Sequence, residues 1–291
     1  MDRTRGFSVR IFIPSGDPAG LRVVEKSNWT GVGVVFPRSV MQEALDRAEL
    51  ARPGVYIIWG PGKSPEMPLV YIGEGAETGA RLSTHAKKKE FWTNAAVFAS
   101  KDANLNKAHI QYLEARLLRR ADEEKRCELD NGNVPQLPVL SDVDRADSDL
   151  FLDDLLLCLP VVGVRFLQKP GTQAQTIHPL FLHAKGIKAQ GYVDSSGFVV
   201  RSGSQAVKKE VRSIHKFLSV ERTALIERGV LSTTEDSDNY YTITQDYTFS
   251  SPSSAAGVLL GRSASGPSEW KDKEGRTLKD LQEESAEELS G

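Results

Sequence analysis

Residues 54–73 read GVYIIWGPGKSPEMPLVYIG, and this stretch decides how the first half of the chain folds. The runs at 54–59 and 69–73 are apolar and rich in β-branched and aromatic residues, which predicts two strands. The segment between them, 60–68, is dense in Gly and Pro and predicts a loop. Together they predict an antiparallel hairpin with a long tip.

The segments after the hairpin predict a small unit of helices on this sheet. We expect a helix over 78–88, a strand over 91–99 and a second helix over 105–121. Asp102 or Asn104 is the candidate cap of that second helix. The fold class is therefore α+β: a small antiparallel sheet flanked by helices.

Polar residues with catalytic potential recur along this unit. Tyr56 and Tyr71 lie on the two strands of the hairpin. Arg81 and His85 are four residues apart, so they project from the same face of the first helix. Any of these could be ordinary packing or surface residues, but the position of Arg81 and His85 just after the second strand favours a site shared with the two tyrosines.

Glu114 borders the apolar stripe that Ile110, Leu113 and Leu117 form on the second helix. A carboxylate half-turned into a core is costly unless it is paired or binds a metal. It either pairs with a nearby basic residue, Arg81 or Lys107, or holds a divalent cation. One carboxylate together with water and phosphate oxygens suits Mg²⁺ or Mn²⁺.

Gly54-Val55-Tyr56 and Tyr71-Ile72-Gly73 resemble the paired signature of the GIY-YIG nuclease family, and an Arg, a His, a Glu and an Asn follow in that family's order. The resemblance covers roughly residues 52–135. It departs from the family at Val55, which replaces an Ile, and in the longer hairpin tip. The residues that it implies for catalysis are Tyr56, Tyr71, Arg81, His85, Glu114 and Asn131.

This resemblance implies a metal-dependent DNA endonuclease in which Glu114 binds Mg²⁺ or Mn²⁺. Tyr56 would help deprotonate the attacking water, aided by His85 or Tyr71, and Arg81 would stabilise charge on the phosphate. Asn131 would orient the site, although Asn133 in the same turn competes for that role.

Charge supports a polyanionic partner only locally. The chain has a net charge of −2, whereas residues 81–126 contain eleven basic and six acidic residues, a net charge of +5. A lysine run is commonly a solvated helix end, but beside a phosphate site it can follow a nucleic-acid backbone. The candidate DNA contacts here are Lys87, Lys88, Lys89 and Lys101.

Composition changes divide the chain into parts. The ranges are a β-rich extension at 1–50, the nuclease-like core at 51–168, a linker at 169–179, a C-terminal domain at 180–281 and an acidic tail at 282–291. The extension ends in a helix over 40–50 capped by Ser39. The extension either packs against the core as an accessory or contributes to DNA binding or dimer contact. A strand is expected over 161–166.

The C-terminal domain combines short strands with a helix that Ser251 caps and Pro252 starts. It resembles an uncharacterised module commonly fused to GIY-YIG nucleases and is similar to modules beside restriction enzymes and adenine methylases. That resemblance implies DNA reading, with Arg262, Trp270 and Lys271 as contacts. Alternatively, Trp270 fills a small core.

Together these features predict a cytoplasmic, metal-dependent DNA endonuclease of restriction or phage-defence type, with a homodimer as the candidate assembly. Two cysteines, Cys127 and Cys158, are too few for a metal cluster or a disulfide framework. No apolar run reaches the ~18 residues that a membrane helix needs. The alternatives are a non-cleaving DNA-binding or assembly protein on the same fold, and a structure-specific repair or recombination nuclease.

Overall fold

A computed structural model describes residues 6–64, 66–102, 104–170, 178–233 and 239–288. The chain forms two compact units, of which the first contains Met1–Lys63 and Met67–Gln168 and the second Ser64–Glu66 and Lys169–Gly291. Most of the expected linker, residues 171–177, lies outside the described residues, as do residues 1–5 and 289–291 of the two ends. The architecture is mixed α+β, as predicted.

The described part of the first unit is built on a seven-stranded sheet with the order β1-β2-β3-β6-β4-β5-β7. The pairs β1–β2, β2–β3, β3–β6 and β6–β4 are antiparallel, whereas β5 and β7 run parallel. The strands are β1 Val9–Phe12, β2 Arg22–Lys26, β3 Gly31–Pro37, β4 Gly54–Ser64, β5 Met67–Gly75, β6 Asn94–Ser100 and β7 Glu128–Leu129.

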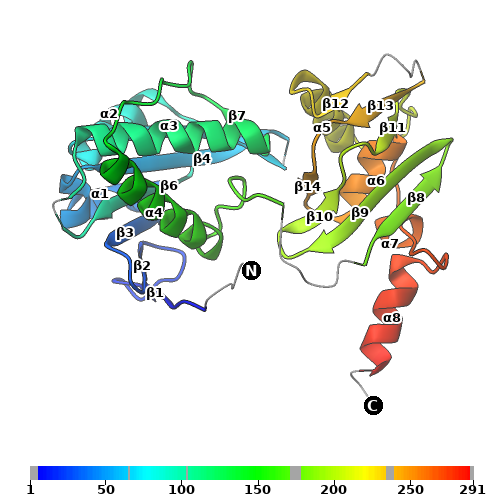
Figure 1. Ribbon diagram of the computed structural model, residues 1–291, viewed down its shortest axis with the longest axis horizontal. Helices are drawn as coiled ribbons and strands as arrows, with labels where there is room; N and C mark the ends of the chain where they lie inside the picture. The colour runs from blue at the N-terminus through cyan, green and yellow to red at the C-terminus, as the bar shows by residue number, and fades with distance from the viewer. Residues whose placement is uncertain (1–5, 65, 103, 171–177, 234–238, 289–291) are drawn as a thin grey trace. The chain divides into compact units, whose positions relative to one another are not determined.

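Helices cover this sheet on both faces (Figure 1). Alternation along β4 sends Val55 and Ile57 into one hydrophobic core, with α3 and α4, and Tyr56 and Ile58 into the other, with α2. β4 is therefore buried on both sides, which explains its continuous apolar run. The helices of this unit are α1 Met41–Leu45, α2 Thr78–Lys88, α3 Lys107–Glu124 and α4 Asp142–Cys158, with 3₁₀ turns at Arg38–Val40, Ala48–Ala51 and Pro160–Val162.

The hairpin tip differs from the prediction. Strand β4 continues through the Gly- and Pro-rich segment to Ser64, and β5 already begins at Met67. Pairing of β4 with β6 stops at Trp59, opposite Asn94. Beyond that point one side of β4 needs no ladder donors, so a strand there tolerates Pro61.

Three other local predictions are wrong. The helix expected over 40–50 is the short α1 between two 3₁₀ turns, without a side-chain cap. The cap of α3 is Asn106, whose side chain accepts from the amides of Ala108 and His109. The segment 161–166 forms a 3₁₀ turn and coil after α4, because Pro160 stops the helix and Gly163 adopts a positive φ.

The described part of the second unit contains a four-stranded sheet, β14-β10-β9-β8, and a three-stranded sheet, β11-β13-β12. Ser251 caps α6 and Pro252 opens it, as predicted, and α6 lies behind the larger sheet (Figure 1). The elements are β8 Leu180–Ala184, β9 Ile187–Asp194, β10 Gly197–Val200, β11 Gln205–Val207, α5 Lys216–Glu227, β12 Leu231–Ser232, β13 Tyr240–Ile243, β14 Tyr247–Phe249, α6 Pro252–Leu260, α7 Gly266–Glu269 and α8 Leu278–Glu288.

No helix within the described ranges is both long enough and apolar enough to cross a lipid bilayer. The two cysteines, Cys127 and Cys158, are buried and are not joined in a disulfide.

Candidate active site

Tyr56 and His85 form a hydrogen-bonded pair between β4 and α2. The Tyr56 hydroxyl lies 2.8 Å from Nδ1 of His85, and the Tyr56 side chain is fully buried. Burial, followed by the nearby Tyr71, raises the pKa of Tyr56 well above its ordinary value. Burial and the charge of Arg81 lower the pKa of His85 below 6.5. At neutral pH the pair is therefore a neutral phenol next to a neutral imidazole.

Gly73 makes room for the Tyr56 ring. A Cβ at position 73 would lie 2.4 Å from the Tyr56 hydroxyl oxygen and 2.5 Å from Cζ. Real Cβ atoms do not approach other atoms so closely, so any side chain here would displace the phenol. The position of the Tyr56 ring therefore requires glycine at position 73, the last residue of the Tyr71-Ile72-Gly73 tripeptide.

Tyr71 lies beside the same imidazole. Its ring centroid is 4.8 Å from that of His85 in an edge arrangement and 6.2 Å from that of Tyr56. The Lys89 ammonium also sits 4.2 Å from the Tyr71 ring centroid, and it forms a short ion pair with Asp130. Lys89 is therefore held beside the site and is not free in solvent.

Asn131 ties the loop after β7 to strand β5. Its side-chain oxygen accepts from the Ile72 amide at 3.0 Å, and its side-chain nitrogen donates to the Ile72 carbonyl at 2.7 Å. These two bonds fix the backbone between Tyr71 and Gly73. Asn133 is exposed, so of the two candidate asparagines only Asn131 makes this contact.

Glu114 is a half-buried carboxylate on α3 with a pKa raised to about 7. The largest cause is burial, the next is the negative charge of Glu74, and Lys107 and Arg81 oppose both. Lys107 forms a short ion pair with Glu74 rather than with Glu114. The predicted alternative in which Glu114 is simply a surface residue paired with a base therefore lacks a direct ion pair here.

Arg81 supplies the positive charge that these groups share. It lies exposed on α2, one turn before His85. Its charge acts on the pKa values of Tyr56, His85 and Glu114 alike. We call Tyr56, Tyr71, Arg81, His85 and Glu114 the tyrosine–glutamate cluster.

The cluster has the donors that a hard divalent cation requires. Within the described residues no group of three or more His, Cys, Asp and Glu side chains is arranged to hold a metal. Lys107 forms an ion pair with Glu74 and acts on Glu114 only through its charge, and one Glu74 oxygen, Oε2, is buried without a hydrogen-bond partner. Oxygen donors with incomplete compensation fit Mg²⁺ or Mn²⁺ completed by water and phosphate oxygens.

The other predicted basic contacts lie at different places. Lys87 and Lys88 are exposed at the end of α2, next to His85. Lys101 follows β6 and is 3.6 Å from Glu25 of β2, in the N-terminal extension. Lys87 and Lys88 thus extend the cluster's positive charge, whereas Lys101 belongs to another surface.

In the C-terminal unit, burial argues against one predicted contact. Trp270 is fully buried, its ring lies 4.5 Å from Phe198, and its indole nitrogen donates to the Pro252 carbonyl at 3.0 Å. Its role is therefore core packing, and a base cannot stack on it. Arg262 is engaged as well, in a short ion pair with Glu269.

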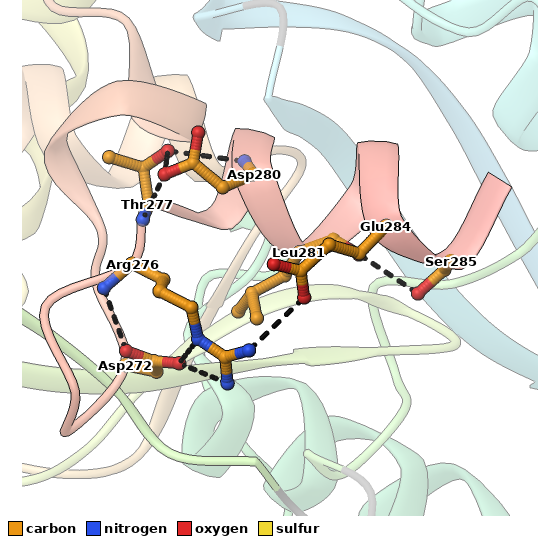
Figure 2. Close-up of polar contacts among 7 residues, drawn as sticks. All are labelled: Asp272, Arg276, Thr277, Asp280, Leu281, Glu284 and Ser285. Atoms are coloured by element: carbon orange, nitrogen blue, oxygen red, sulfur yellow. Dashed lines mark hydrogen bonds and ion pairs between the residues drawn. The ribbon is translucent and has the colours of Figure 1, made fainter. Parts of the chain in front are cut away.

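Lys271 is exposed and lines a cavity of about 640 Å³ together with Phe181, His183 and Lys273. The neighbouring loop is held by Arg276, which bridges Asp272 and Glu284, while Thr277 and Asp280 cap α8 (Figure 2). Of the three residues predicted to contact DNA here, Lys271 is the one placed at a concave surface.

Two features around the cluster were not predicted from the sequence. Glu74 was not among the predicted site residues, although its position directly after Gly73 is a signal that could have found it. The ion pair between Lys89 and Asp130 joins residues 41 positions apart, and no local sequence pattern predicts it.

Comparison with protein families gives one finding for this chain: residues 180–282 match the model of a domain of unknown function, DUF4357. No GIY-YIG family model matches the first unit. No curated protein and no solved structure matches the chain.

Proposed function

We propose that the chain is a metal-dependent DNA endonuclease whose active site is the tyrosine–glutamate cluster. The observation that carries the proposal is Glu114, a half-buried carboxylate beside Arg81 and the Tyr56–His85 pair. A carboxylate, a guanidinium and a proton-accepting pair are the groups that phosphodiester hydrolysis needs.

Each residue has a role that its surroundings support. Glu114 holds the divalent cation, which when bound polarises the scissile phosphate and lowers the pKa of water. The neutral His85 accepts a proton through Nδ1, so Tyr56 can pass its own hydroxyl proton to His85 while taking one from the attacking water. Arg81 neutralises charge that develops on the phosphate oxygens. Asn131 keeps β5, and with it Tyr71, in place.

DNA is the proposed substrate because positive charge gathers around this cluster in a chain of net charge −2. Arg81, Lys87, Lys88 and Lys89 lie on or directly after α2. Lysine ammonium groups bind phosphates as point charges and make affinity strongly salt-dependent.

We further propose that the C-terminal unit reads DNA through the Lys271 surface and that the protein serves in restriction or phage defence. The first idea has support from the concave shape of this surface and its two exposed lysines, Lys271 and Lys273, which lie there beside Glu269 and Asp272. The second depends on the resemblance of residues 180–281 to modules beside restriction enzymes and methylases, which is an analogy of domain context.

The deciding experiment is a plasmid nicking assay with Mg²⁺ or Mn²⁺ against EDTA, with plain and base-modified phage DNA as further substrates. We expect metal-dependent nicking by the wild type, none by Glu114→Ala, and unchanged duplex binding by that variant. Glu123→Ala, on the same helix, is the matched control and should nick normally. Nicking in EDTA, or by Glu114→Ala, would contradict the proposal.

The alternative, a non-cleaving DNA-binding protein on this fold, makes a different prediction in the same assay. Duplex binding without cleavage of any substrate would favour it, whereas cleavage restricted to branched DNA would favour a repair nuclease.

A further inference from the structure

Glu74 is an acidic residue whose charge acts on Glu114, and its two carboxylate oxygens have different surroundings. It lies in β5 directly after Gly73, and its side chain is 15% exposed. One carboxylate oxygen, Oε1, forms a short ion pair with Lys107. The other, Oε2, is buried and has no hydrogen-bond partner.

A buried carboxylate oxygen without a donor costs free energy, because water no longer solvates it. Strand β5 could bury an apolar residue here at no such cost, as it does with Ile72 two positions earlier on the same face. The orphan oxygen therefore indicates a partner that is not part of the polypeptide.

The negative charge of Glu74 acts on Glu114. The charge of Glu74 is the second cause, after burial, of the raised pKa of Glu114. Two carboxylates in a half-buried setting repel each other, and Lys107 offsets that repulsion only in part. A divalent cation between them would remove it, because it brings two positive charges to the pair.

Lys107 is the exposed member of its ion pair with Glu74. Its side chain is 58% exposed and lies at the first turn of α3, whereas the Glu74 side chain is 15% exposed. The Glu74 carboxylate needs a positive charge beside it, because a partly buried charge without a partner is costly. Lys107 supplies that charge in the metal-free protein, and a bound cation would supply it when Lys107 turns into solvent.

We propose that Glu74 is a second acidic ligand of the divalent-cation site, joining Glu114 directly or through a water molecule. This inference rests on the proposed metal-dependent function and adds a residue to it. The ligand is a hard divalent cation such as Mg²⁺ or Mn²⁺, since both donors are carboxylate oxygens.

The test is Mn²⁺ binding to the full chain without DNA, measured as loss of the free Mn²⁺ signal in electron paramagnetic resonance. Glu74→Gln keeps the shape and removes the charge, and we expect it to weaken Mn²⁺ binding by about 10-fold or more. Lys107→Met removes a repelling charge, and we expect it to tighten binding by about 3-fold or more. Glu77→Gln, which changes an exposed acid three residues after Glu74, should change Mn²⁺ affinity little.

The opposite changes in Mn²⁺ affinity expected for Glu74→Gln and Lys107→Met distinguish a metal ligand from a purely structural residue. If Glu74 only anchors α3 through Lys107, the two variants break the same ion pair and must change Mn²⁺ affinity in the same direction. That result, or wild-type affinity in Glu74→Gln, would overturn the inference while leaving Glu114 as a ligand. If the wild type shows no Mn²⁺ binding that Glu114→Ala abolishes, the proposed function itself fails. Circular dichroism of each variant checks that the fold persists.

Discussion

The hydroxyl of Tyr56 lies 2.8 Å from Nδ1 of His85, and burial moves the pKa values of the two groups in opposite directions. The phenol keeps its proton far above neutral pH, and the imidazole loses its proton below pH 6.5. The phenol is fully buried, whereas the imidazole is partly exposed. In the proposed mechanism, this contact gives the proton of the attacking water a path through Tyr56 to His85.

This pair predicts an acid limb in the pH–rate profile. The chemical step needs neutral His85, so turnover should fall as the pH drops through the His85 pKa, which lies below 6.5. Arg81, Lys88 and Lys89 all disfavour the charged imidazole. Single-turnover nicking rates from pH 5 to 8 test this, and His85→Ala should lose about 10²–10⁴-fold together with the limb.

Metal saturation distinguishes this limb from the titration of Glu114. The pKa of Glu114 is about 7 without metal, and a bound cation competes with its proton. A limb due to Glu114 must therefore move to lower pH as Mn²⁺ rises, whereas a limb due to His85 must stay. A limb that vanishes at saturating Mn²⁺ would remove His85 from the proton path.

Gly73→Ala should disable the site without touching a polar group. The added Cβ would lie 2.4 Å from the Tyr56 hydroxyl oxygen, so the ring must move away from His85. We expect a loss of nicking close to that of Tyr56→Phe. The matched control is Gly132→Ala, where a Cβ meets nothing within 4 Å. Normal turnover in Gly73→Ala would show that the position of the phenol is not critical.

Arg81→Ala should reduce turnover rather than binding. The guanidinium influences Tyr56, His85 and Glu114 together, which places its charge where the phosphate would develop negative charge. Removal of one charge-stabilising donor typically costs about 10²–10³-fold in kcat. Lys87→Ala, on the exposed end of the same helix, should instead weaken DNA binding and reduce its salt dependence. A defect of Arg81→Ala confined to affinity would contradict the role.

The sequence predicts those parts of the site that depend on local pattern. The strand character of 54–59 and 69–73 placed both tyrosines, and the four-residue spacing of Arg81 and His85 placed both on one face of α2. Each of these follows from the period of a strand or a helix. The mixed α+β architecture could be predicted for the same reason.

The remaining features depend on contacts that pattern does not encode. Strand β4 extends through Pro61 because its pairing with β6 ends at Trp59, and pairing partners are not visible in one segment. Asn106 caps α3 instead of Asn104, since its side chain meets two free amides. Trp270 is a core residue because Phe198, 72 positions earlier, packs on it.

A last prediction concerns Glu221 on α5, which the proposed chemistry does not use. This side chain is fully buried. Burial, and then the charge of Glu66, which groups with the C-terminal unit, raise the pKa of Glu221 to about 8. An acid whose folded pKa lies above its unfolded value near 4.5 keeps its proton longer in the native state. Its contribution to stability is therefore full below pH 4.5, declines as the pH rises, and is lost above about pH 8.

Glu221→Gln mimics the protonated acid at every pH. Its stability advantage over the wild type should be small at pH 5. It should then grow by about 1.4 kcal/mol for each pH unit and level off above pH 8. Hydrogen exchange of the amides of α5 and α6 from pH 5.5 to 9, corrected for intrinsic exchange, measures this locally. Glu227→Gln, an exposed acid on the same helix, should show no such trend. If Glu221→Gln is equally stable relative to the wild type at both ends of this range, Glu221 ionises in the native protein near its ordinary pKa, and a neighbouring donor must satisfy its charge.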